Sequence, residues 1–171
     1  MDHQWYNPLS VLGGWTWFSI QLTNDTQYML YFIRDGQNQL VQVVATEVKN
    51  GITSHLSPGS VSETAIGSWT SPVTGITYPS GWMVTVPGGV LHVTPLQTDQ
   101  ELVVAASVAG AYWEGDSAVS GVIDGRPVRG ASYAEVAPVP VPGGTPLPAA
   151  VPAGVQSGVS NQPEMSRPFS P

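Results

Sequence analysis

Short stretches of alternating apolar and polar residues, separated by turn-forming residues, recur through the first 136 positions of the chain. This two-residue period is typical of β-strands, because successive side chains point to opposite faces of a sheet. Asn50-Gly51 and Asp124-Gly125 favour the tight turns that join antiparallel strands. The pattern predicts nine or ten strands, at residues 14–22, 27–34, 40–48, 52–56, 60–66 (the weakest), 81–86, 90–94, 101–108, 112–123 and 126–136.

The spacing of these strands predicts an all-β fold, either an up-and-down barrel or a sandwich, over residues 1–136. Pro72, Gly75 and Pro79 interrupt residues 69–79, which we therefore expect to form an irregular loop. Residues 137–171 are rich in Pro, Gly and Ala and have no periodicity. Such a segment buries too little apolar surface to offset its ordering entropy, so it is predicted to be a disordered C-terminal tail.

The first predicted strand carries two tryptophans at a two-residue spacing. One face is Trp15, Trp17, Ser19 and Gln21, and the other is Thr16, Phe18, Ile20 and Leu22. The second is an ordinary core face. The first grades from large rings into polar groups, which would suit a pocket for an elongated, mainly apolar molecule. The alternative is that both tryptophans are core residues.

Composition excludes several classes of function. Only 10% of the residues are charged, the formal net charge is −7, and the five basic residues are scattered, so nothing indicates nucleic-acid binding. The chain has no cysteine, and His3, His55 and His92 lack ligand-like spacing, so neither a metal nor another cofactor is expected. Neither a signal peptide nor a transmembrane segment is recognisable, which predicts a cytoplasmic location for the chain as written.

A set of short motifs, taken in order, resembles the C-terminal lipocalin-like domain of the carotenoid 1,2-hydratase (hydroxyneurosporene synthase) family, also called the AttH-like family. The motifs are Asp2-His3-Gln4-Trp5, residues 14–22 (GWTWFSIQL), residues 29–31 (MLY), residues 69–72 (WTSP), Thr74-Gly75, Tyr78-Pro79, Gly81-Trp82, residues 99–101 (DQE), residues 112–115 (YWEG), Gly130, Tyr133 and Glu135. The resemblance extends over residues 1–136.

The resemblance implies two lipocalin-like barrels in tandem, of which this chain would contain the second. It also implies a choice of activities. The hydratases of the family are lyases that add water to a terminal carbon–carbon double bond of an acyclic carotenoid, whereas related proteins are pericyclases of the Diels–Alder type. Many members are secreted. A separate first barrel, or a second copy of the chain, is the expected protein partner.

Hydration of an isolated alkene needs a strong, desolvated acid to protonate carbon and aromatic faces to stabilise the resulting cation. Asp2 is the candidate acid, with His3 orienting it or holding the water, and Trp5, Trp15 and Trp17 supply the rings. Burial would raise the pKa of such a carboxyl and keep it protonated. The alternative is that Asp2 and His3 only form hydrogen bonds at the entry to the strand.

Further candidates lie later in the chain. Glu114, on the same strand face as Tyr112, is a second candidate acid, or else an ion-pair partner of Arg34, Arg126 or Arg129. The remaining candidate ligand contacts are Gln21, Trp69, Tyr78, Trp82, Tyr112 and Tyr133. For Trp69, Tyr78 and Trp82 the alternative is packing of the loop against the barrel end. Three functions remain open: a hydratase, a non-catalytic module that binds an apolar molecule, and a pericyclase.

Overall fold

The computed structural model describes residues 13–103 and 111–138, and strand β1 (Gly14–Leu22) lies near the middle of their main sheet. β1 pairs in antiparallel fashion with β2 (Thr26–Arg34) on one side and with β12 (Arg126–Ala137) on the other. The remaining strands of this sheet are β3 (Leu40–Lys49), β4 (Ile52–His55), β5 (Ser62–Ala65), β8 (Trp82–Val86), β9 (Gly89–Pro95), β10 (Glu101–Val103) and β11 (Ala111–Ile123).

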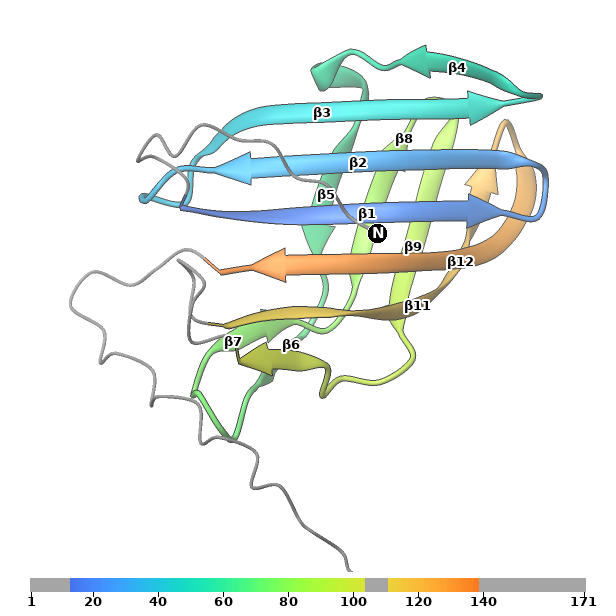
Figure 1. Cartoon of the computed structure of the whole chain (residues 1–171). Coiled ribbons are helices and arrows are strands. Elements are labelled where there is room, and N and C mark those ends of the chain that lie inside the picture. Colours follow the sequence, from blue (N-terminus) through green and yellow to red (C-terminus); the bar gives the residue numbers. More distant parts are fainter. Residues whose placement is uncertain (1–12, 104–110, 139–171) are drawn as a thin grey trace, which may run out of the picture.

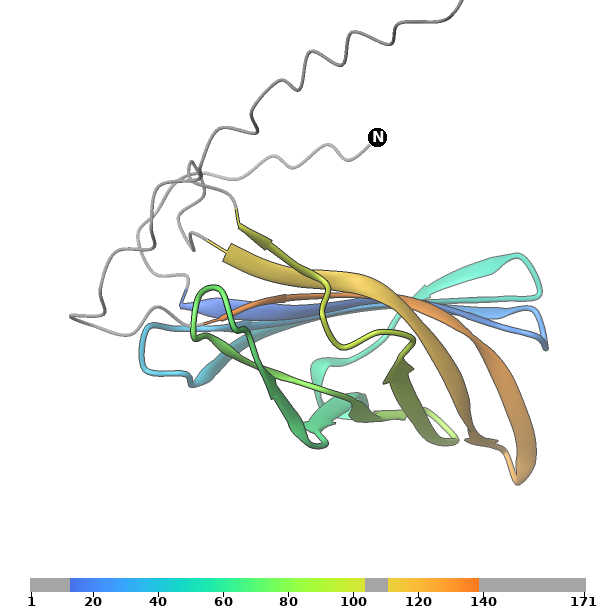
Figure 2. The same ribbon diagram turned by 90° about the horizontal axis from the view of Figure 1, so that it is seen from below.

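The strand order is β4-β3-β2-β1-β12-β11-β9-β8-β5, with β10 paired to β11. β1, β2, β3 and β12 run side by side in one layer, and β5, β8 and β9 cross behind them (Figure 1). Seen from below, β11 and β12 bend from the first layer towards the second, so that the sheet curls over itself (Figure 2). In the described residues, the outermost strands β4 and β5 are joined by the 3-10 turn η1 (Pro58–Ser60) and form no ladder with each other.

The interior of the curl is the hydrophobic core. Phe18 and Ile20 of β1 are fully buried there, as the period-two pattern predicted. Phe18 meets Trp82 edge to face, with ring centroids 5.4 Å apart, and Trp82 packs in turn against Trp113. Because aromatic rings bury large areas, this cluster joins the two layers and stabilises the curl.

The predicted all-β, lipocalin-like fold is confirmed, in the form of a half-barrel, and each predicted strand has a counterpart in the main sheet. The prediction of an irregular loop at residues 69–79 was wrong. This segment contains a small hairpin of β6 (Ser68–Thr70) and β7 (Thr77–Pro79), because Pro72 and Gly75 occupy its turn and Pro79 takes only the last pair of its ladder. The predicted tail lies almost wholly outside the described residues and stays a prediction.

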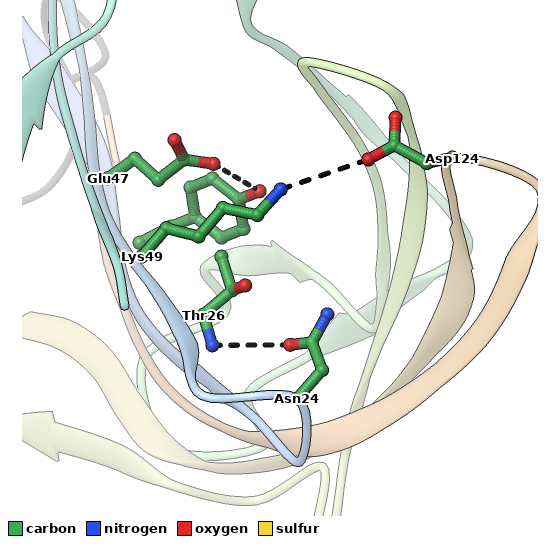
Figure 3. Close-up of polar contacts among 6 residues, drawn as sticks. Asn24, Thr26, Glu47, Lys49 and Asp124 are labelled. Carbon is green, nitrogen blue, oxygen red and sulfur yellow. Dashed lines mark hydrogen bonds and ion pairs between the residues drawn. The ribbon is translucent and has the colours of Figure 1, made fainter. Parts of the chain in front are cut away.

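The end of the curl where β2 begins is held by polar contacts (Figure 3). Lys49, at the end of β3, lies 3.8 Å from the carboxylate of Asp124 in the turn between β11 and β12. Both side chains are well exposed, so the pair contributes little to stability.

Among the described residues, no helix has the length and apolar character needed to cross a membrane.

Candidate functional site

A partly open cavity of about 610 Å³ lies at the opposite end of the curl, where β1 begins and β2 and β12 end (left in Figure 1). Its volume lies within the range of small-molecule pockets. Residues on the inner faces of strands from both layers border it, including Thr16, Arg34, Glu63, Trp82 and Val136. The curl of the sheet therefore brings β1, β2, β5, β8 and β12 together around one space.

One wall of the cavity is an ion pair. Nη2 of Arg34 donates to Oε1 of Glu63 at 2.8 Å, and their side chains are 24% and 6% exposed. Burial raises the pKa of the Glu63 carboxyl, and the neighbouring Arg34 guanidinium and the Thr16 hydroxyl offset only part of that rise. Glu63 is thus a desolvated carboxyl that favours holding a proton, placed where a bound molecule would lie.

The other walls combine apolar and polar groups. Trp82, which is 1% exposed, forms the buried wall of the cavity, and Pro79 and Val136 border it from β7 and β12. The Nε1–H group of Trp82 has no hydrogen-bond partner within the described residues. A partly apolar space with one charged pair and a spare donor suits a mostly apolar molecule with a polar end. The remaining polar side chains of the lining are Thr16, Gln37, Asn38 and Thr77.

Most of the candidate residues on β1 lie on the outer face of the sheet, away from the cavity interior. Trp15 and Trp17 are half-buried there, and the Trp15 indole N–H donates to Oε1 of Glu135 at 2.8 Å. Trp15 also meets Tyr31 edge to face. Gln21 is exposed and donates to Ser19. Trp15 borders the cavity only at its rim end, beside Thr16, so the ring-lined face predicted from the sequence is an outer surface.

Glu114, Tyr112 and Tyr133 lie on the same outer face. Glu114 stands directly opposite Glu135 in the β11–β12 ladder. Burial, followed by the charge and a hydrogen bond of Glu114, raises the pKa of Tyr133 to about 12. Arg34, one of the ion-pair partners expected for Glu114, is instead bonded to Glu63. These residues form a cluster of rings and carboxylates separate from the cavity, and their roles stay predictions.

Two other candidates belong to the β6–β7 hairpin. The rings of Trp69 and Tyr78 stack with centroids 6.1 Å apart, and Tyr78 is 1% exposed. The Tyr78 hydroxyl donates to Glu101 at 2.8 Å, and burial together with this contact raises its pKa. This geometry fits the alternative, packing of the segment against the barrel end. Of the described residues predicted to contact a ligand, Trp15 and Trp82 are the two that line the cavity.

The proposed acid Asp2, with His3 and Trp5, lies outside the described residues and stays a prediction. Glu63 was not singled out in the sequence, and Arg34 was named only as a possible ion-pair partner of Glu114, although the sequence carries a signal for an interior pair. Arg34 continues the two-residue spacing of Tyr28, Leu30 and Phe32, which are all buried. A charged residue on an otherwise apolar face of a strand needs a partner, and that requirement would have pointed to an interior ion pair.

The comparisons with known proteins agree with this architecture. The AttH-like family model matches residues 1–137. The chain belongs to the AttH-like family. It is 26% identical over 138 residues to kievitone hydratase of Fusarium solani subsp. phaseoli. The aligned residues make up 79% of this chain and 39% of that relative. The family predicted from the sequence motifs is therefore confirmed.

Two crystal structures share the fold. An AttH candidate protein from Nitrosomonas europaea has a TM-score of 0.66 and 31% identity, over 80% of this chain and 41% of that one. Kievitone hydratase from Nectria haematococca has a TM-score of 0.66 and 25% identity, over 79% of this chain and 42% of that one. The AttH-like chain thus spans about two fifths of the length of these relatives.

Proposed function

We propose that this AttH-like domain binds an elongated, mainly apolar molecule in the cavity and is part of a hydratase that adds water across a carbon–carbon double bond. The observation that carries the proposal is the desolvated Glu63 carboxyl in a cavity walled by Trp82, Pro79 and Val136. Apolar walls exclude bulk water, which strengthens electrostatic interactions at the reacting carbon. The relationship to a kievitone hydratase supports a hydratase rather than another class of enzyme.

Glu63 is the residue to which we assign the proton. Protonation of an alkene forms a bond from the acid hydrogen to one carbon and leaves a carbocation on the other. Water then adds to that cation and returns a proton to the carboxylate, so the acid is regenerated. Burial raises the pKa of this carboxyl, which makes its protonated form easier to reach than that of an exposed glutamate, and the face of the Trp82 ring would stabilise the cation. Asp2 is the competing acid predicted from the sequence.

The relatives' greater length supports a second part of the proposal. A further lipocalin-like domain, present as a separate protein or as a second copy of this chain, would complete the enzyme. The experiment therefore includes the domain alone and the domain supplied with such a partner.

The test is to incubate the protein with acyclic isoprenoid alkenes and to look by mass spectrometry for a product heavier by one water. Glu63→Gln should abolish the product while leaving binding of the alkene within about twofold, because the amide keeps the size of the side chain but cannot supply a strong acid. Glu47→Gln, near the end of β3 that lies away from the cavity, is the matched control and should keep activity. Loss of product in Asp2→Asn but not in Glu63→Gln would transfer the acid role to Asp2, and binding without product in every form would leave a binding module.

A further inference from the structure

The hydrogen-bonding groups along the cavity are not balanced. The Arg34 guanidinium has five N–H donors, and its partner among the described residues is Oε1 of Glu63. Trp82 borders the same cavity and is 1% exposed, and its Nε1–H group has no hydrogen-bond partner among the described residues. A buried donor left without an acceptor, such as the Trp82 N–H, costs free energy, and the partly exposed Arg34 guanidinium has N–H groups to spare, so the site is suited to a molecule that brings an acceptor.

We propose that Arg34 donates a hydrogen bond to a hydroxyl oxygen of the bound molecule and that Glu63 accepts the hydrogen of the same hydroxyl. The cavity would then select apolar alcohols over hydrocarbons of the same skeleton. This inference rests on the proposed binding function, whose ligand class it narrows.

The charge of the site favours a neutral hydroxyl over an anion. Arg34 and Glu63 are already hydrogen-bonded to each other at 2.8 Å, so an anionic group would have to compete with Glu63 for the guanidinium. A carboxylate placed there would also lie beside the buried Glu63 carboxyl, and two such groups close together are unfavourable at low dielectric when both are charged. A hydroxyl, in contrast, both donates and accepts, and it can bridge the guanidinium and the carboxylate without separating them.

The geometry also limits where the polar end of the ligand would lie. Thr16, Arg34 and Glu63 come from β1, β2 and β5, on both sides of the opening between the two layers. Trp82 and Val136 continue the wall with apolar surface. The hydroxyl would therefore rest against the pair, and the hydrocarbon part would lie along Trp82.

The test compares an acyclic isoprenoid alcohol with the hydrocarbon of the same skeleton, each displacing a neutral fluorescent probe from the full chain. The ratio of the two dissociation constants is measured in the wild type and in Arg34→Met/Glu63→Leu. The wild type and the double variant are tested with the same two ligands in water, so the difference in solubility between the alcohol and the hydrocarbon cancels when their two ratios are compared. Replacing both partners avoids leaving an unpaired buried charge, so the double variant should fold. Arg129→Met, which removes an exposed arginine of β12, is the matched control.

The preference for the alcohol should fall by about tenfold in the double variant and stay unchanged in Arg129→Met, since hydrogen bonds to charged groups discriminate by about that factor. Affinity for the hydrocarbon should change little. A ratio that is the same in all three proteins would overturn the role of Arg34 and Glu63 while leaving the cavity as a binding site. Failure of both ligands to displace the probe from the wild type would refute the proposed function itself, and this inference with it.

Discussion

Glu63 occupies an unusual position for a charged residue in this protein. Its neighbour two residues earlier is the buried Val61, the next one on the same side is Ala65, which is exposed but lines the cavity, and the intervening Ser62 and Thr64 are exposed and do not line it. The alternation identifies a carboxyl on the inner side of a strand. The segment is short and polar overall, which is why it reads as a weak strand in the sequence and why its one inner carboxyl is easily overlooked.

The raised pKa of Glu63 makes a prediction about stability. A glutamate in an unfolded chain titrates at about pH 4.3, and here the folded protein holds the proton more tightly. The contribution of Glu63 is therefore fully present below that pH and is lost as the pH rises through the folded-state pKa. The melting temperature of the wild type, relative to Glu63→Gln, should fall steadily as the pH increases from about 4.

Circular dichroism melts of the two proteins across a pH series measure this difference. The subtraction removes the other titrating groups, which both proteins share. If the melting temperature of the wild type minus that of Glu63→Gln rises with pH, the attraction of Glu63 to Arg34 outweighs the cost of burying its charge. That result would contradict the assignment of a proton to Glu63.

The two faces of β1 show which features of a strand its residue pattern can predict. The period of two separated Phe18 and Ile20 from Trp15 and Trp17 correctly, and the first pair is fully buried. The pattern assigned the face of Phe18 and Ile20 to the core, but it could not decide whether the face of Trp15 and Trp17 borders a pocket, packs in the core or lies on the outside of the sheet. That choice depends on the direction in which the sheet curls, and the curl is set by strands such as β11 and β12 that lie far along the chain.

At the scale of elements, the two-residue turns were predictable because their chemistry is local. Asp124 and Gly125 have φ values of 50° and 73°, the left-handed region that such hairpin turns require. The β6–β7 hairpin was not predictable in the same way. Its ladder is three residues long on each side, and Ser71 and Thr74 at its turn are held by Glu101, which is distant in sequence.

Gly125→Ala should lower the free energy of unfolding by about 1 kcal/mol, because an L-residue with a Cβ is strained at this φ. The added Cβ would meet nothing within 4 Å, so the effect isolates the backbone. Gly59→Ala is the control, since its Cβ is equally unobstructed and its φ lies outside that region. Urea unfolding followed by tryptophan fluorescence gives both values, and equal losses at the two positions would contradict the argument.

At the scale of the whole molecule, one carboxylate connects the small hairpin to the curled sheet and so to the cavity. Glu101, on β10, accepts hydrogen bonds from Ser71 at 2.5 Å, Thr74 at 2.6 Å and Tyr78 at 2.8 Å. Ser71 and Tyr78 are buried, so without this acceptor their hydroxyls would be left unsatisfied. Thr77 and Pro79 of the same hairpin border the cavity, and the position of that wall therefore depends on Glu101.

Glu101→Ala should consequently destabilise the fold by about 1–3 kcal/mol for each buried hydroxyl left without a partner and should weaken ligand binding in the same variant. Asp99→Ala, which removes an exposed carboxylate just before β10, should do neither. Thermal melts give the stability, and probe displacement well below the melting temperature gives the affinity of the folded form. If Glu101→Ala loses stability but binds the probe as tightly as the wild type, the hairpin only covers the core. A loss of affinity in the folded variant would instead show that the hairpin is part of the binding wall, and that the cavity depends on a contact between segments about thirty residues apart in sequence.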